Sequence, residues 1–263
     1  MGDLAALRSG LASMGRVVAA FSGGADSAFL TWMATDTLGA DRVVAATAVS
    51  PSLAPRELAD CEALAGEWGL QWLAVDTHEL EEPSYVANGA DRCYHCKASL
   101  MDSLGPVASG MGATVVLGVN LDDLGDHRPG QAAAAERGAR FPLVETGFTK
   151  ADVREASRRL GLRTWDKPAS ACLASRLPYG TPVTVGRLSS VAEAEEGLHR
   201  LGFGQLRVRH YGDLARVELL PDDLAAALAR RSDVVAAVRA AGYRYVTLDL
   251  EGFRSGNLNQ SLA

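Results

Sequence analysis

The segment from Ser22 to Ser27 has the residue types of a phosphate-binding loop. It reads Ser-Gly-Gly-Ala-Asp-Ser and follows a short apolar run at residues 17–21. Gly23 and Gly24 allow the backbone to adopt positive φ angles and to approach an anion closely. The N–H groups that open the following helix favour negative charge. The hydroxyls of Ser22 and Ser27 can donate to phosphate oxygens, so we predict a phosphate site here.

Asp26, in the same loop, either caps the helix or helps to hold Mg²⁺. The plain alternative for the whole segment is a glycine turn followed by an ordinary helix cap. The order of strand, turn and helix favours the phosphate site, because a lone Gly-Gly pair has no such context. No lysine follows the glycines, so the loop differs from the G-x-x-x-x-G-K-[ST] motif.

A second polar stretch follows the apolar run at residues 114–117. It contains Gly118, Asp122, Asp126 and Arg128. After a strand of a parallel sheet, such a loop can face a bound nucleotide. The alternative is a polar loop that ends in a helix opened by a proline.

Three basic residues are candidates for contacts with anions. Lys150 opens a helical pattern at residues 149–160 and could meet pyrophosphate or simply be solvated. Arg207 and Arg209 alternate along a predicted strand, so both project from one face. Two guanidinium groups on one face suit a substrate phosphate, and a solvated strand face is the alternative.

Three of the four cysteines are candidate metal ligands. Cys93 and Cys96 form a C-x-x-C, which is compatible with zinc, redox chemistry or a cluster. Together with Cys172 they could hold three irons of a [4Fe–4S] cluster and leave the fourth iron open to sulfide. The alternative is two unrelated thiols at the start of a helix. Cys61 shares a helical stripe with apolar residues, so we interpret it as a core residue.

The elements that must position these residues alternate between strands and helices up to about residue 180. This alternation is typical of an α/β fold with a parallel sheet covered on both faces. We assign residues 1–180 to this domain. The predicted strands are 17–21, 43–49, 72–75 and 114–117, and the predicted helices are 26–38, 54–68 and 98–108.

A turn-rich stretch at residues 179–182 precedes a change of pattern. Beyond it we predict a smaller α+β domain at residues 181–263, which serves substrate binding or oligomerisation. Its expected elements are a helix at 188–201, a hairpin at 206–210 and 214–219, helical segments within 222–241 and a strand at 245–250.

The overall composition is that of an ordinary soluble globular protein. The 263 residues carry a formal net charge of −6, with 48% apolar and 22% charged residues. This charge argues against a broad nucleic-acid surface, because phosphate neutralisation needs clustered Lys and Arg. We find neither a membrane-spanning run nor a signal-peptide core, so we expect no membrane association and a cytoplasmic location.

The phosphate loop resembles the SGGxDS loop of the PP-loop ATP pyrophosphatases, which adenylate a substrate and release pyrophosphate. Over nearly its whole length the chain resembles the LarE family, ATP-dependent sulfur transferases of nickel-pincer nucleotide synthesis and lactate racemase maturation. The segments that carry this resemblance are 22–27, 92–97, 118–130, 167–179, 205–219 and 247–256.

The resemblance implies an adenine nucleotide alpha-hydrolase-like sheet, ATP with Mg²⁺ and a pyridinium dicarboxylate mononucleotide as substrate. A carboxylate is adenylated, and sulfur then displaces AMP. In members with one cysteine, the residue that matches Cys172 gives up its own sulfur. Members that also carry the C-x-x-C look cluster-dependent, and we favour a cluster supplied with sulfide or another sulfur donor.

The resemblance also implies further site residues and an assembly. Ser175 and Arg176 follow the sulfur-bearing position and are expected to orient substrate. Glu195 and Glu218 match acidic residues near that site. Arg207 and Arg209 are favoured as a clamp on the substrate phosphate. A homo-oligomer, such as a hexamer, is expected.

Three other functions stay open. A cluster-dependent tRNA thiolase shares the loop and the cysteines, although the acidic balance and the C-terminal segments disfavour it. An amidating PP-loop synthetase would need a source of ammonia. A nucleotide-binding regulatory module would release no pyrophosphate with any substrate.

Overall fold

The computed structural model describes residues 2–125 and 129–254. The chain groups into two compact units, Met1–Tyr85 with Asp91–Ser170, and Val86–Ala90 with Ala171–Ala263. Residues 171–180 therefore group with the second unit, whereas the sequence assigned them to the first domain. The functional boundary at residue 180 stays a prediction. Within the described ranges, no helix is long and apolar enough to cross a membrane.

The described part of the first unit is built on a four-stranded parallel sheet in the order β3-β2-β1-β4. Its strands are β1 (Val17–Ala20), β2 (Val43–Val49), β3 (Gln71–Asp76) and β4 (Thr114–Leu117). All four predicted strands are confirmed, and so is the α/β class. Because β1 and β4 are neighbours and parallel, the loops that follow them meet at one edge of the sheet.

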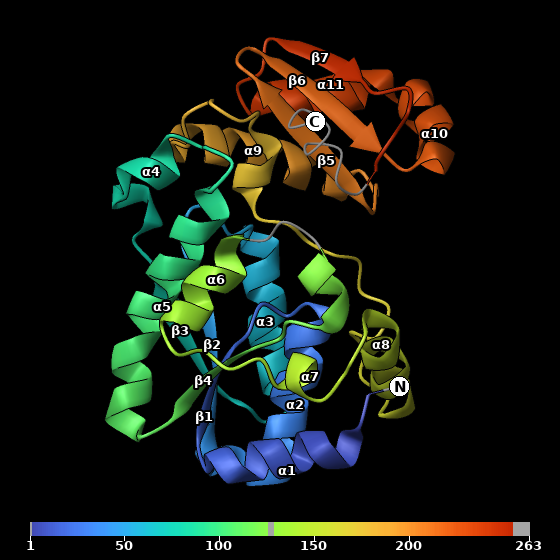
Figure 1. Ribbon diagram of the computed structural model, residues 1–263. Coiled ribbons are helices and arrows are strands. Elements are labelled where there is room, and N and C mark those ends of the chain that lie inside the picture. Colours follow the sequence, from blue (N-terminus) through green and yellow to red (C-terminus); the bar gives the residue numbers. More distant parts are fainter. Residues whose placement is uncertain (1, 126–128, 255–263) are drawn as a thin grey trace. The chain divides into compact units, whose positions relative to one another are not determined.

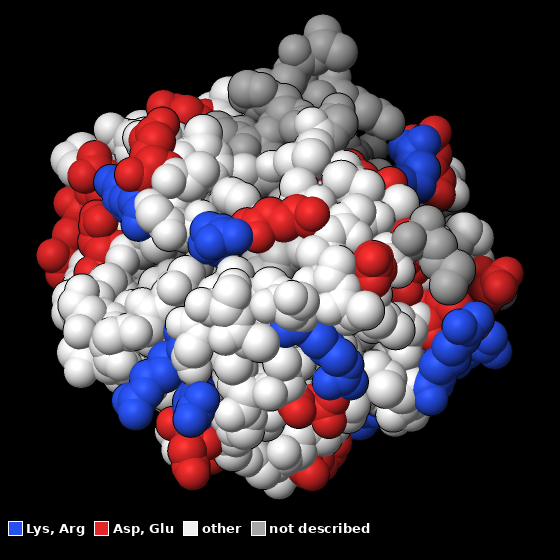
Figure 2. All heavy atoms as spheres, turned by 60° about the horizontal axis from the view of Figure 1, so that its bottom comes forward, with Lys and Arg blue, Asp and Glu red and all other residues white. Residues whose placement is uncertain are grey.

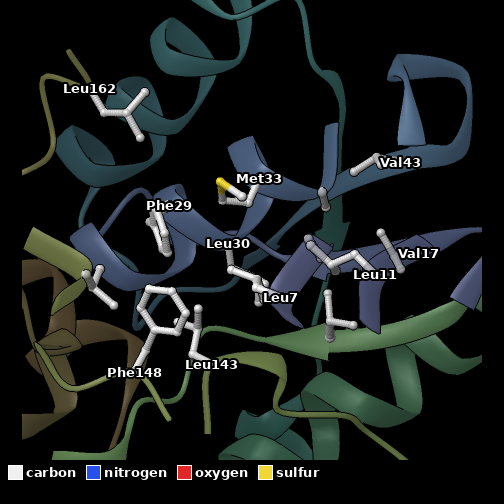
Figure 3. Packing of buried hydrophobic residues seen from close by; sticks show 14 residues of the cluster. Leu7, Leu11, Val17, Phe29, Leu30, Met33, Val43, Leu143, Phe148 and Leu162 are labelled. Carbon is white, nitrogen blue, oxygen red and sulfur yellow. The ribbon is translucent and has the colours of Figure 1, made fainter. Parts of the chain in front are cut away.

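Helices cover both faces of this sheet (Figure 1). Successive side chains of β1 point to opposite faces, so each face has its own core. Val17 and Ala19 belong to a cluster that includes Phe29 of α2, and Figure 3 shows this packing. Val18 belongs to a second cluster on the other face, with Leu104 of α5. The helices of this part are α1 (Leu4–Met14), α2 (Ala25–Leu38), α3 (Pro55–Glu67), α4 (Pro83–Val86), α5 (Arg92–Met111), α6 (Pro129–Glu136), α7 (Pro142–Glu145) and α8 (Lys150–Arg159).

Helix α5 begins at Arg92, six residues before the predicted start at residue 98. Cys93 and Cys96 therefore lie in its first two turns rather than in a loop before it. No side chain of a described residue caps this helix, so no capping residue marks its start in the sequence. Tertiary packing extends it instead: a Cβ at Gly130 of α6 would lie 2.7 Å from Lys97 Cγ and 2.8 Å from the Cys93 carbonyl oxygen.

The second unit contains a three-stranded sheet in the order β5-β6-β7 within its described residues. Strands β5 (Leu206–Tyr211) and β6 (Leu214–Leu219) form the predicted antiparallel hairpin, and β7 (Tyr245–Leu248) pairs parallel to β6. The helices are α9 (Val185–Arg200), α10 (Leu224–Ala229) and α11 (Arg231–Ala240). Alternate strand residues such as Val208 and Val217 pack with Leu198 of α9, so this unit has its own core.

Candidate functional site

The loop after β1 turns sharply into helix α2. Gly23 has φ +66°, a conformation that residues with side chains rarely adopt. A Cβ there would lie 3.1 Å from Cys61 Sγ and 3.5 Å from Leu64 Cδ1. Gly24 is the N-cap of α2, and no side chain of a described residue caps the helix. The N–H groups of its first turn lack intrahelical acceptors, so they favour an anion.

The two serines of the loop have different roles in this geometry. Ser27 is buried, and its Oγ accepts from the Ser22 N–H at 3.2 Å and donates to the Gly24 carbonyl at 3.1 Å. The two hydroxyl oxygens are 3.0 Å apart. Ser22 itself is exposed. Ser27 therefore shapes the loop, and Ser22 presents the more accessible hydroxyl.

Gly118, which follows β4, meets the first turn of α2 at very close range. A Cβ at this position would lie 2.7 Å from the Ser27 nitrogen and 2.8 Å from the Asp26 carbonyl carbon. Both neighbours are backbone atoms that cannot rotate away. The end of β4 can approach the phosphate loop only because residue 118 is glycine.

Asp26 is positioned by the loop that follows β4. The buried Asn120 donates from Nδ2 to Asp26 Oδ1 at 3.0 Å, and its own N–H donates to Asp123 at 3.1 Å. Burial raises the pKa of Asp26 above 3.8, whereas the bond from Asn120 and the charges of Lys150 and Arg154 oppose the rise. Carboxylate and amide oxygens suit Mg²⁺, which usually takes one or two carboxylates together with substrate phosphates.

Asp122 joins the same loop to helix α8. Its carboxylate accepts from the Lys150 N–H at 2.7 Å, so it fixes the first turn of α8 beside the loop that holds Asp26. The predicted residues Asp126 and Arg128 lie outside the described residues. The phosphate loop, Gly118, Asp122 and Lys150 are thus joined within the first unit.

In the second unit, Arg176 holds the backbone around Cys172. Its guanidinium donates to the carbonyl oxygens of Ala171 and Cys172, the latter at 3.1 Å. Two further bonds, of 2.9 and 3.0 Å, join it to the carboxylate of Glu195. Glu195 also accepts from the Val208 N–H at 2.9 Å, so it links α9 to β5. Arg176 and Glu195 therefore fix the conformation of the cysteine segment.

Arg209 is also held by a carboxylate. It donates to both oxygens of Glu218 at 3.0 Å, and to the Ser175 carbonyl at 2.8 Å. The two side chains are 1% and 0% exposed. Glu218 accepts from Arg216 as well. The charge of Arg209 is neutralised, so this residue braces the segment that contains Ser175.

Arg207 lies on the same strand and has no such partner. No carboxylate of a described residue forms an ion pair or hydrogen bond with it, although it is 8% exposed. Its guanidinium carbon lies 4.9 Å from the ring centroid of Phe253. Burial, followed by the charges of Arg176 and Arg209, lowers the pKa of Arg207 to about 10. It stays cationic at neutral pH, and an anionic ligand would supply the missing partner.

No protein-family model matches the chain. The pyridinium-3,5-bisthiocarboxylic acid mononucleotide synthase of Lactiplantibacillus plantarum is 39% identical over 259 residues, which cover 98% of this chain and 94% of that protein. The chain belongs to the LarE family. An uncharacterized protein of Synechocystis is 47% identical over 97% of this chain and 96% of its own length.

The cysteines of this LarE-family chain fall into three settings. Cys61 is fully buried in a core cluster, as predicted. Cys93 is exposed and Cys96 half-buried, one helical turn apart in α5, so both thiols can face one ligand. Cys172 is exposed just before a short 3₁₀ turn at residues 173–176. No disulfide joins these four cysteines, all of which lie in the described ranges.

The thiols of Cys93, Cys96 and Cys172 are the kind of ligand that an iron–sulfur cluster takes. The C-x-x-C pair lies at a helix N-terminus, where the dipole favours thiolates. Within the described residues of either LarE unit, no three His, Cys, Asp or Glu side chains are arranged around one metal position. The pair belongs to the first unit and Cys172 to the second.

The sequence analysis missed two residues of this LarE-family site. Asn120 positions Asp26 although 94 residues separate them. The signal was its place in the polar stretch between Gly118 and Asp122. Arg154, whose charge acts on Asp26, follows Lys150 by four residues and thus lies on the same helical face.

Proposed function

We propose that this chain is an ATP-dependent sulfurtransferase. It converts a carboxylate of pyridinium-3,5-biscarboxylic acid mononucleotide into a thiocarboxylate. The observation that carries the proposal is the full-length similarity to the synthase of L. plantarum. The glycine-lined loop, the exposed Cys172 and Arg207, which pairs with no carboxylate of the described residues, support it, because each suits one part of this chemistry.

The first step is adenylation on the loop between Ser22 and Ser27. A carboxylate oxygen of the substrate attacks the α-phosphorus of ATP, the bond from that phosphorus to the bridging oxygen breaks, and pyrophosphate leaves. Backbone N–H groups at the start of α2 and the Ser22 hydroxyl bind phosphate oxygens. Asp26, held by Asn120, provides a carboxylate for Mg²⁺, which neutralises charge on the phosphates. Lys150 lies beside this loop and takes the leaving pyrophosphate.

The second unit binds the substrate's own phosphate. Arg207 is the primary contact, because it is a nearly buried cation to which no carboxylate in residues 2–125 and 129–254 is paired. Arg209 assists by bracing the segment of Ser175, and Glu218 keeps Arg209 in place. A charge-assisted contact with phosphate contributes roughly 1.5–3 kcal/mol. Arg207 therefore anchors the mononucleotide while its carboxylate reacts.

Sulfur then displaces AMP from the acyl-adenylate. Cys93, Cys96 and Cys172 would hold a [4Fe–4S] cluster, which would supply sulfide at its open iron. On the alternative route the Cys172 thiolate attacks the carbonyl carbon and AMP leaves. Loss of the Cα proton then breaks the Cβ–S bond, which leaves dehydroalanine at 172 and sulfur on the product. On both routes Arg176 positions Cys172 through its carbonyl oxygen.

The charged surface agrees better with a small substrate than with a nucleic acid. Acidic and basic residues are interspersed on the face drawn in Figure 2, where the described residues form no continuous basic surface. Thiol chemistry also requires a reducing compartment, and we therefore propose that the enzyme acts in the cytoplasm.

The test is a product analysis of the protein purified without oxygen, given ATP, the mononucleotide and sulfide. We expect AMP, pyrophosphate and thiocarboxylate, over many turnovers when iron is present. Cys172→Ala should still release pyrophosphate but form no thiocarboxylate. ADP as the sole nucleotide product would refute the proposal. A single turnover without iron, with dehydroalanine at 172, would select the route through Cys172 over the cluster.

A further inference from the structure

Helix α8 carries two cations on one face. Lys150 and Arg154 are four residues apart, and residues at this spacing are neighbours on a helix surface. A capping box between Thr149 and Asp152 fixes where the helix begins. Val153 of α8 and Phe29 of α2 belong to one core cluster, so the two helices pack against each other. The first turn of α2 includes the end of the phosphate loop.

Arg154 is half-buried, and its guanidinium is incompletely bonded. Its Nη2 donates to the carbonyl oxygen of Lys167 at 3.3 Å. Its Nε is buried, and no described residue accepts from it. No carboxylate of a described residue lies within ion-pair distance of Arg154. A partly buried cation in this state is unfavourable unless a ligand supplies the counter-charge.

Three other basic residues around α8 are held by carboxylates. Arg158 and Arg159 pair with Glu155 on the exposed side of the helix. Lys167, whose Nζ would lie 3.6 Å from a Cβ at Gly23, is bound by two carboxylates of α3, those of Glu57 and Asp60. Arg154 thus differs from these three residues in charge balance, and it donates to the backbone of Lys167, whose ammonium lies near Gly23 of the loop.

We propose that Arg154 binds the phosphate chain of the nucleotide held on the loop between Ser22 and Ser27. Its unused N–H groups donate to phosphate oxygens as a planar fork, beside the ammonium of Lys150. This inference rests on the proposed use of ATP and adds a binding residue to it. It also explains why the loop needs no lysine of its own: helix α8 brings the cations from more than 120 residues downstream.

The experiment is calorimetric titration of the full chain with ATP, and competition with adenosine, which lacks phosphates. Arg154→Gln removes the charge and keeps an N–H donor for the Lys167 carbonyl. We expect its ATP affinity to fall about tenfold or more and its adenosine affinity to stay within about twofold. Arg154→Lys should recover ATP binding to within about threefold of the wild type. Arg158→Gln, on the same helix, is the control and should bind ATP normally.

Normal ATP affinity in Arg154→Gln would overturn the proposal. A parallel loss of ATP and adenosine binding, with a lower melting temperature, would also overturn it, because the role would then be structural. If Arg154→Gln does not fold, the ratio of ATP to adenosine affinity is measured in Arg154→Lys instead. This ratio then decides between phosphate binding and a structural role. A wild-type chain that binds no ATP would refute the proposed function itself, and this outcome is distinct from a defect confined to the variants.

Discussion

The phosphate loop of the first unit and the arginine cluster of the second unit are both suited to anions, but they are built differently. The loop uses backbone N–H groups and two glycines, with Gly118 approaching the Ser27 nitrogen from the neighbouring strand. The arginine cluster, Arg176, Arg207 and Arg209, uses side-chain charge on a buried strand and turn. Two of its three arginines are neutralised by carboxylates.

This difference determines what each region can tolerate. A site made of backbone depends on the absence of side chains, because an added Cβ moves the donors themselves. A site made of buried side chains depends on charge balance, because removing one partner leaves the other unpaired. We therefore expect steric changes to damage the loop and charge changes to damage the cluster.

The largest effect is expected for Gly118→Ala. The new Cβ would collide with backbone at 2.7 Å, which costs about 1–3 kcal/mol of stability. Displacement of the loop by about 1 Å should lower the rate of pyrophosphate release about 100-fold. Gly10→Ala is the control, since a Cβ there meets nothing within 4 Å. Equal rates in the two variants would contradict the proposed role of this close approach.

In the cluster, Arg209→Met should destabilise the fold strongly, because it leaves Glu218 buried with fewer donors. We expect a loss of about 3 kcal/mol in the free energy of unfolding, measured by denaturant titration. Arg209→Met combined with Glu218→Leu should recover most of this loss. Arg207→Met should change stability by less than about 1 kcal/mol while raising KM for the mononucleotide about tenfold. Similar stability losses in Arg207→Met and Arg209→Met would contradict the difference between these residues.

Asp26 is the charged residue of the phosphate loop, and its contribution to stability should depend on pH. Its raised pKa means that the folded state binds more protons than the unfolded state just above pH 3.8. The contribution of Asp26 to stability therefore falls as pH rises through that range. Asp26→Asn should melt at a higher temperature than the wild type near pH 7, and this gain should shrink towards about pH 4. Asp26→Asn should also fail to release pyrophosphate. A melting temperature below that of the wild type at neutral pH would refute the prediction.

The smallest effect is expected at Phe253, whose ring contacts Arg207. Phe253→Leu keeps apolar contact and loses the cation–π interaction, which contributes about 0.5–2 kcal/mol. KM for the mononucleotide should rise roughly threefold to tenfold, with little change in kcat. Steady-state kinetics would test this, and Tyr245→Leu, an exposed residue on β7, is a suitable control. A fall in kcat without a change in KM would argue that Phe253 does not orient Arg207.

The sequence predicted the elements of the first unit well, because its strands are short buried runs that alternate with amphipathic helices. The phosphate loop could be predicted for the same local reason: the strand, the glycines and the helix are contiguous. The early start of α5 at Arg92 could not, since packing against Gly130 rather than a capping side chain extends that helix.

What the sequence alone determined is which chemical groups the chain contains and their local order: the loop of residues 22–27, the cysteines and the alternating arginines. Only the tertiary structure distinguished Arg207 from Arg209. In the hairpin register Glu218 lies opposite Arg207, yet its carboxylate binds the diagonal neighbour, Arg209. Likewise, Asn120 bonds to Asp26, and the charge of Arg154 acts on it, only through strand order and helix packing. Charge balance around a buried group depends on contacts between distant segments, and local sequence does not specify those contacts.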